Sequence, residues 1–265
     1  MRAAKSTAEG RVKVVLWSTQ FAEDRDCIPE GFMATADLPR SVQDCGKFSS
    51  KRRYPLLADI LQALFDSSEA EYLIFTNVDI ALMPDFYRRV DDLIASGNDS
   101  LIINRRRIPA IYDSAEQLDA MYQVKGKAHP GFDCFVFHRS LLPKFQLGHI
   151  CIGVPFIGIG LAQNLFCYGK NFRLVKDEHL TFHIGMEIFK GRAPKEYFQH
   201  NRKEFWGAIA RMWDDLDSRK FPYGKQWLPF RLLRWGLHPS LPIRLGLALE
   251  PRRLWGLKGR PPQIK

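Results

Sequence analysis

The spacing of hydrophobic residues changes repeatedly between positions 56 and 103, and this alternation restricts the chain to few folds. After Pro55, apolar side chains recur at helical spacing up to Phe65, whereas the next apolar run, 72–76, is continuous. A second helical pattern begins near Pro84, and another apolar run follows at 101–103. Continuous apolar strands separated by amphipathic helices are typical of an α/β fold in which helices flank a mostly parallel sheet. We therefore expect ligands to bind at the carboxyl ends of the strands.

The flanking sequence extends this pattern in both directions. A β-branched run at 12–17 predicts an opening strand, 132–137 and 180–183 predict later strands, and 194–213 predicts a helix. The stretch 145–169 has no charged residue, but glycines and a proline interrupt it, so we expect a buried segment instead of a membrane span. The pattern divides the chain into an α/β domain at 10–190 and, at 191–265, a helix with a basic extension rich in Trp and Pro.

Asn77 and Asp79 follow the apolar run 72–76 directly, where a buried strand is expected to end. Oxygen donors two positions apart suit a hard cation, so Asp79 is a candidate ligand for Mg²⁺ or Mn²⁺ that also binds a diphosphate. Asn77 would order a water molecule or a ribose. A simple turn at the end of a strand is the alternative, because Asn and Asp are common there.

The segment 72–87, YLIFTNVDIALMPDFY, resembles the D-x-D region of nucleotide-diphospho-sugar glycosyltransferases with the GT-A fold. In that family the motif follows a hydrophobic strand and binds the metal and the donor diphosphate. Asn77 stands where the family has its first Asp, so Asp79 is the one carboxylate carried over. The resemblance implies a GT-A-like, Rossmann-like sheet, a divalent cation (Mn²⁺ or Mg²⁺), and sugar transfer from a nucleotide diphosphate donor to an acceptor hydroxyl.

The resemblance also implies roles for two residues further along the chain. In similar enzymes an acidic residue in the later half contacts the acceptor or deprotonates its hydroxyl, and Asp133 is the candidate here. Some of them supply a late histidine followed by glycine as a metal ligand, and His183 with Gly185 resembles that arrangement. A turn-capping aspartate and a hydrogen-bonded structural histidine are the alternatives.

Arginines close to the expected ligand edge are candidates for phosphate contacts. Arg105 begins an arginine triplet after the run 101–103, and Arg53 precedes the first predicted helix. Guanidinium groups bind phosphate oxygens through paired hydrogen bonds. Solvated basic turns are the alternative at both places, and we expect it to hold for two of the three arginines in 105–107.

The net charge of +10 arises entirely in the C-terminal part of the chain. Residues 1–185 contain 22 basic and 22 acidic side chains, whereas 186–265 contain 17 and 7. There the basic residues are interleaved with Trp and Leu, a mixture typical of segments that lie on an anionic membrane surface. Packing of the apolar side chains on the body, with solvated arginines, is the alternative. Nucleic-acid binding is disfavoured because no known binding module is present.

The remaining observations concern compartment and competing functions. Five cysteines without a C-x-x-C pair predict reduced thiols, and the N-terminal stretch lacks the apolar run of a signal peptide. We expect a cytoplasmic protein, peripheral to the inner face of a membrane. Three functions compete: a metal-assisted glycosyltransferase with a glycan or lipid-linked acceptor, a degenerate relative that binds a nucleotide or glycan without turnover, and a nucleic-acid binder.

Overall fold

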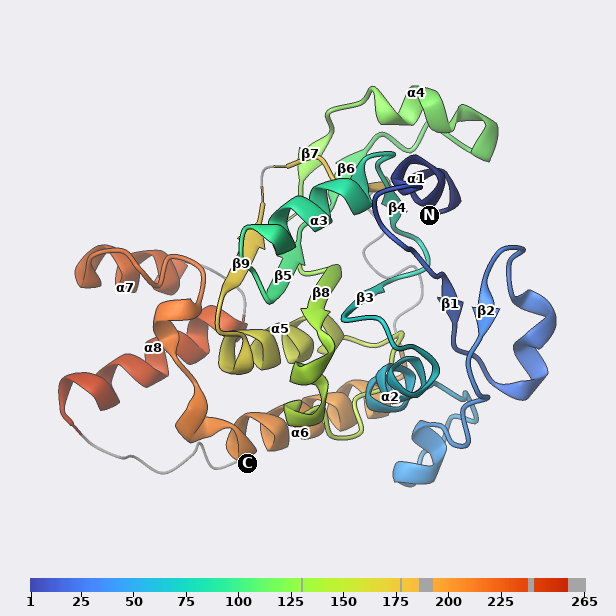
Figure 1. Ribbon diagram of the computed structural model, residues 1–265. Coiled ribbons are helices and arrows are strands. Elements are labelled where there is room, and N and C mark those ends of the chain that lie inside the picture. Colours follow the sequence, from blue (N-terminus) through green and yellow to red (C-terminus); the bar gives the residue numbers. More distant parts are fainter. Residues whose placement is uncertain (130, 177, 186–192, 238–240, 257–265) are drawn as a thin grey trace.

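The predicted alternation of helices and strands is confirmed in the computed structural model, which describes residues 1–129, 131–176, 178–185, 193–237 and 241–256 (Figure 1). Helix α2 (Leu57–Ser67) leads to strand β3 (Tyr72–Thr76), and helix α3 (Phe86–Ala95) leads to strand β5 (Ser100–Ile103). The chain therefore has a mixed α/β fold.

The central sheet has four strands in the order β3-β8-β5-β9. Strands β8 (Cys134–His138) and β9 (Phe172–Val175) complete it. β9 is parallel to β5, but β8 is antiparallel to both β3 and β5. The sheet is thus mixed, where we predicted a mostly parallel one, because β8 is inserted between two strands that run in the same direction. This insertion places the start of β8 beside the carboxyl ends of β3 and β5.

A second sheet of four short strands has the order β4-β10-β6-β7. Its members are β4 (Ala81–Leu82), β10 (Thr181–Ile184), β6 (Arg106–Ile108) and β7 (Lys127–Ala128). β10 is antiparallel to β4 and parallel to β6. Arg106 and Arg107, for which we expected a basic turn, therefore belong to a strand.

The opening strand predicted at 12–17 is wrong except for its last residue. Strand β1 (Trp17–Ser18) pairs in parallel with β2 (Met33–Ala34). Val12, Val14 and Leu16 instead pack into a hydrophobic cluster with helices α1 (Arg2–Ala8) and α3. Packing of alternate side chains explains the apolar pattern there without a neighbouring strand.

Helices cover both faces of the central sheet, and alternate residues of β8 mark the two faces. Cys134 and Val136 pack in the cluster with α1 and α3. Phe135 and Phe137 pack on the other side with α2, α5 (Ile157–Tyr168) and α6 (Lys195–Arg211). The prediction of a buried segment at 145–169 is confirmed in part, since every residue of α5 from Gly160 to Cys167 is buried, whereas Gly153 is exposed and several other residues of the stretch are half-buried.

The C-terminal helices join the same core. Helix α6 confirms the helix predicted at 194–213. Trp235 of α7 (Leu228–Leu237) and Leu245 and Leu249 of α8 (Leu241–Leu254) pack in the cluster that contains α2 and α5. The predicted domain boundary at 190 lies outside the described residues.

The remaining elements are short. They are α4 (Leu118–Tyr122) and the 3₁₀ helices Ala22–Cys27, Val42–Cys45, Ala115–Gln117, Arg139–Lys144, Trp213–Asp215 and Ser218–Lys220. Among the described residues, no helix combines the length and the hydropathy that a membrane span requires.

Candidate active site

Three strand termini of the central sheet meet at one edge. Cys134, the first residue of β8, pairs with Thr76 at the end of β3 and with Ile103 at the end of β5. The Thr76 hydroxyl also donates to the Asp133 carbonyl oxygen at 3.2 Å. The polar segments that follow β3 and β5 therefore lie next to the one that precedes β8, as expected for a ligand-binding edge.

Asp79 and His183 come together at this edge. His183 lies on β10, which pairs with β4 just beyond the Asp79 turn. His183 Nε2 lies 3.2 Å from Asp79 Oδ2, with the imidazole buried and the Asp79 side chain 56% exposed. His183 Nδ1 lies 3.3 Å from the carbonyl oxygen of Gly185. Since a carbonyl only accepts hydrogen bonds, this contact assigns a proton to Nδ1 and directs Nε2 at Asp79.

Asp133 is buried beside Arg105, with 3.0 Å between Arg105 Nη1 and Asp133 Oδ1. The other oxygen, Oδ2, is buried and has no hydrogen-bond partner among the described residues. Burial raises the pKa of the Asp133 carboxyl, although the positive charge of Arg105 opposes this. Asp79 and His183 also act electrostatically on Asp133, so the four side chains form one group.

Two further residues lie at this edge: Asn104, which the sequence placed at the ligand edge without a role, and His129, which sequence reasoning did not single out. Asn104 is buried, its Nδ2 donates to the His129 carbonyl oxygen at 2.9 Å, and the His129 amide donates to the Arg105 carbonyl oxygen at 3.0 Å. Burial, reinforced by Arg105, lowers the pKa of His129 to about 4, so its imidazole is neutral near pH 7. Its position directly after a buried apolar run indicated Asn104, but no local pattern indicates His129.

The other predicted site residues lie differently. Asn77 is exposed, and its carbonyl oxygen accepts from the Ile80 amide at 3.2 Å, which is the turn that we considered as an alternative. Arg53 forms an ion pair with Glu23 and lies over the Phe21 ring, 4.3 Å from its centroid. Its guanidinium is thus held by the N-terminal region, and its phosphate role stays a prediction.

Of the three consecutive arginines, Arg105 pairs with Asp133. Arg106, in β6, donates to the carbonyl oxygens of Lys125 and Gly126, so it fastens the segment before β7. Arg105 is the arginine whose guanidinium lies at the candidate site.

Two hollows flank Asp79. One, of about 310 Å³, is lined by Met1, Arg2 and Phe32 as well as by the Asp79 turn. The other, of about 300 Å³, is lined by the 112–121 segment and by β10. Cavities of this size are at the lower end of those that bind small molecules. Asp79 thus lines both hollows, so its position suits contact with two different small molecules.

The residues present fit a divalent cation that is shared with a substrate. The part of the chain that the structure describes contains no group of three or more His, Cys, Asp or Glu side chains able to hold a metal ion. Asp79 and His183 supply two donors, 3.2 Å apart, whereas neighbouring ligands of an octahedral Mg²⁺ are about 3 Å apart. Mg²⁺ commonly takes one or two protein donors and completes its shell with water and phosphate oxygens. The pair therefore does not suit a cation bound by protein alone.

Comparison with known proteins gives structural likeness without sequence likeness. No protein-family model matches the chain, and no curated protein matches its sequence. The crystal structure of Staphylococcus aureus TarS residues 1–349 with UDP-GlcNAc is similar at 9% identity, with a TM-score of 0.44 over 89% of this chain and 78% of that one. The same TarS segment with UDP gives 10% identity and a TM-score of 0.42 over 92% and 78%, respectively. A mycobacterial protein gives 11% identity and a TM-score of 0.34, with 85% of each chain covered.

Proposed function

We propose that the protein is a GT-A-like glycosyltransferase. It transfers a sugar from a nucleotide diphosphate donor to a hydroxyl of a glycan or lipid-linked acceptor, assisted by Mn²⁺ or Mg²⁺. One observation carries this proposal: the exposed Asp79, its partner His183 and the buried Asp133, whose Oδ2 is unbonded among the described residues, meet at one sheet edge, and Asp79 lines the two hollows there.

Asp79 and His183 would hold the cation and, through it, the donor diphosphate. When bound, such an ion supplies positive charge that stabilises the departing diphosphate. Arg105 adds a permanent positive charge at the same edge, and its N–H groups other than the one on Asp133 are the proposed donors to phosphate oxygens. Asn77, exposed at the start of the turn, would contact the ribose or an ordered water.

Asp133 is the proposed general base of an inverting transfer. Its unbonded Oδ2 takes the proton of the acceptor hydroxyl as that oxygen attacks the anomeric carbon of the sugar. The bond from the anomeric carbon to the diphosphate oxygen breaks, and the nucleoside diphosphate leaves with the electron pair. A raised pKa suits this role because a more basic carboxylate accepts the proton more readily.

The first experiment measures thermal stabilisation of the purified protein by UDP, GDP, CDP, ADP, dTDP and UDP-GlcNAc, each with and without Mn²⁺. A ligand that binds the native state raises the apparent melting temperature. We expect a metal-dependent rise with one diphosphate, which Asp79→Ala abolishes. Asp24→Ala, which removes an equally exposed carboxylate from another part of the chain, should leave the rise unchanged.

A measurement of turnover then distinguishes an enzyme from a degenerate protein that binds without turnover. Asn77, in place of the first Asp of the motif, permits this alternative. Release of nucleoside diphosphate from the matching nucleotide sugar, faster with an acceptor than without, supports the transferase. Binding without release would leave a protein that holds a nucleotide or glycan. No thermal shift with any nucleotide would contradict the transferase and the binding of a nucleotide without turnover, and would leave a protein that binds a glycan or another partner.

A further inference from the structure

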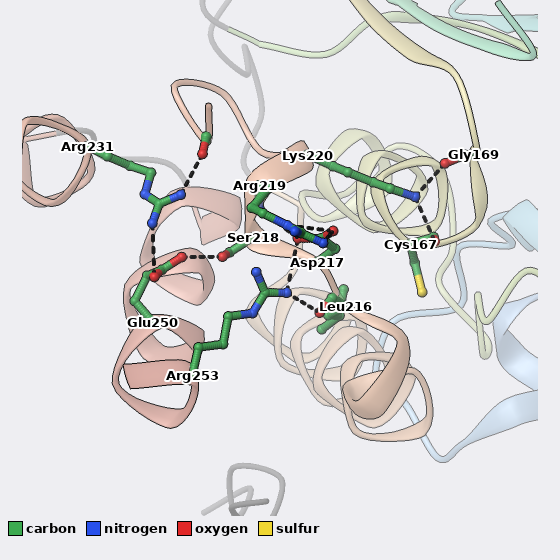
Figure 2. A network of polar contacts seen from close by, with 11 residues as sticks. Cys167, Gly169, Leu216, Asp217, Ser218, Arg219, Lys220, Arg231, Glu250 and Arg253 are labelled. Carbon is green, nitrogen blue, oxygen red and sulfur yellow. Dashed lines mark hydrogen bonds and ion pairs between the residues drawn. The ribbon is translucent and has the colours of Figure 1, made fainter. Parts of the chain in front are cut away.

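The inward side of helix α7 is fixed by buried contacts (Figure 2). Trp235 is fully buried, and its Nε1 donates to the Pro222 carbonyl oxygen at 2.7 Å. Arg231, one turn earlier, forms an ion pair with Glu250 of α8, with 3.0 Å between Nη2 and Oε2. Because these contacts set the rotation of α7 about its axis, its opposite side has to face outward.

That opposite side is apolar. Phe230, Leu233 and Leu237 are spaced three or four positions apart within α7, so they share one side of the helix, and Trp227 directly precedes its first residue; all four are exposed. Trp227 is 78% exposed and Leu237 is 75% exposed. We call these four residues the outer face of α7. Large apolar side chains are seldom left exposed together on a soluble domain without a binding role.

The exposed charges of the segment that carries the outer face, 225–256, are positive. Lys225 is exposed next to Trp227, and the exposed Arg234 lies over the Phe230 ring, 5.0 Å from its centroid. Between residues 225 and 256 the sequence contains a single acidic residue, Glu250, which is buried and paired with Arg231. No acidic side chain of this segment therefore balances the exposed cations.

We infer that the outer face of α7, with Lys225 and Arg234, docks on an anionic lipid bilayer. Trp and Leu partition into the membrane interface while Lys and Arg pair with anionic headgroups. The ten residues of α7 measure about 15 Å, half of a bilayer core, so the helix lies along the interface and does not cross it. A second copy of the chain is less suitable, because it would bring another positive surface against the first. The inference does not depend on the proposed sugar transfer.

The test uses the full chain and sedimentation with phosphatidylcholine vesicles, with and without phosphatidylglycerol. We expect binding to the anionic vesicles and a blue shift of tryptophan emission, both weakened by salt. Trp227→Ser with Leu233→Ser removes apolar side chains of the outer face, and Lys225→Gln with Arg234→Gln removes its charge. Each pair should lower the affinity about tenfold or more.

Matched control variants remove apolar or basic side chains from exposed positions elsewhere in the chain. Met33→Ser with Ile111→Ser, and Lys47→Gln with Arg88→Gln, should leave vesicle binding unchanged. Equal binding by all variants, or none by the unmodified protein, would overturn the inference. A dimer in solution that Trp227→Ser with Leu233→Ser dissociates, without vesicle binding, would identify a second copy as the partner instead. Salt-sensitive RNA binding without vesicle binding would identify nucleic acid.

Discussion

Among the described residues, two arginine–carboxylate pairs are buried, one at the candidate site and one between the C-terminal helices. Arg105 meets Asp133, and Arg231 meets Glu250, each with a nitrogen–oxygen distance of 3.0 Å. In the second pair both carboxylate oxygens are bonded, because Ser218 donates to Oε1 of Glu250 (Figure 2). In the first pair, Oδ2 of Asp133 has no hydrogen-bond partner among the described residues.

This difference separates a group that serves the fold from one that is available to a substrate. A buried oxygen without a hydrogen bond costs free energy of folding, and burial correspondingly raises the pKa of Asp133 despite the neighbouring Arg105. A carboxylate with both oxygens bonded, like Glu250, has less capacity left for a ligand. The unbonded oxygen, more than the ion pair itself, is therefore what nominates Asp133 as a functional group.

The largest expected effect is on turnover, from Asp133→Asn. The amide oxygen still accepts a hydrogen bond from Arg105, but the amide cannot take a proton from the acceptor. We expect the transfer rate per folded molecule to fall about 10²- to 10⁴-fold while the nucleotide-induced shift is retained. Release of nucleoside diphosphate by the two proteins measures the loss. Full turnover by the variant would remove the contrast between the two carboxylates.

The reverse result is expected for Glu250→Ala, which leaves Arg231 buried without its counter-charge. Breaking a buried pair from one side costs about 3–5 kcal/mol, which corresponds to a melting temperature lower by about 10 °C. Turnover per folded molecule should be retained. Calorimetry of the unfolding transition measures the effect.

The matched control is Glu69→Ala. Glu69 also pairs with an arginine, Arg139, at 3.1 Å, but its side chain is 97% exposed. Removing an exposed partner costs less than about 1 kcal/mol. Similar losses for the two variants would mean that burial does not distinguish these pairs.

The sequence predicted several elements of the α/β body better than it predicted their contacts, and it predicted neither α7 nor α8, the helices that carry the second pair. α2, β3, α3 and α6 follow from local hydrophobic spacing, which a single segment reveals. The insertion of β8 between β3 and β5 depends on pairing between distant segments, so local spacing could not show it. The same kind of pairing made Arg106 and Arg107 part of a strand.

The sequence predicted those residues of the candidate site that lie at the ends of predicted strands. Asp79, Arg105 and Asp133 follow or precede apolar runs, and their elements meet at one edge. The contact of His183 with Asp79 requires β10 to pair with β4, and His129 arrives through a loop without a recognisable pattern. Arg53 was selected for its charge alone, and its pairing with Glu23 was not visible in the local sequence. The catalytic and binding roles of these residues stay predictions.

A smaller effect is expected from Gly158→Ala in α5, which tests how firmly the helix holds the site. A Cβ at Gly158 would lie 2.5 Å from the carbonyl oxygen of Phe132, the residue before Asp133. Backbone has to move to relieve this contact, so we expect a loss of about 1–3 kcal/mol together with reduced turnover. Denaturant unfolding and product release measure the two effects.

Gly236→Ala is the control for the glycine substitution. Gly236 lies in α7, where a Cβ would meet no atom within 4 Å. Alanine favours a helix over glycine, so stability should stay equal or rise by up to about 1 kcal/mol. A loss in this variant equal to that of Gly158→Ala would point to a general effect of the substitution and not to the contact with Phe132.

The smallest effect is a pH dependence that originates at Asp217, in the same network as Glu250 (Figure 2). Burial is the largest influence and would raise the pKa of Asp217, but hydrogen bonds from Arg219 and Arg253 outweigh it and hold the pKa well below its usual range. A carboxyl whose pKa is lower in the folded than in the unfolded state stabilises the fold above its unfolded pKa, near 4, and loses this contribution as pH falls. At neutral pH, Asp217→Asn should therefore cost about 1–2 kcal/mol.

Unfolding free energies of the unmodified protein and of Asp217→Asn, compared at neutral pH and from about pH 5 down to about pH 3, test this expectation. The difference between the two proteins should shrink as the pH falls, because Asp217 of the unmodified protein takes up a proton in the unfolded chain while it stays ionised in the folded protein. Asp24→Asn, an exposed substitution of the same kind, should show little difference at any pH. Asp133 has the opposite sign, since a raised pKa in the folded state opposes folding at neutral pH. A difference for Asp217→Asn that grows in acid would contradict the assignment of Asp217 to the bonded, fold-stabilising class.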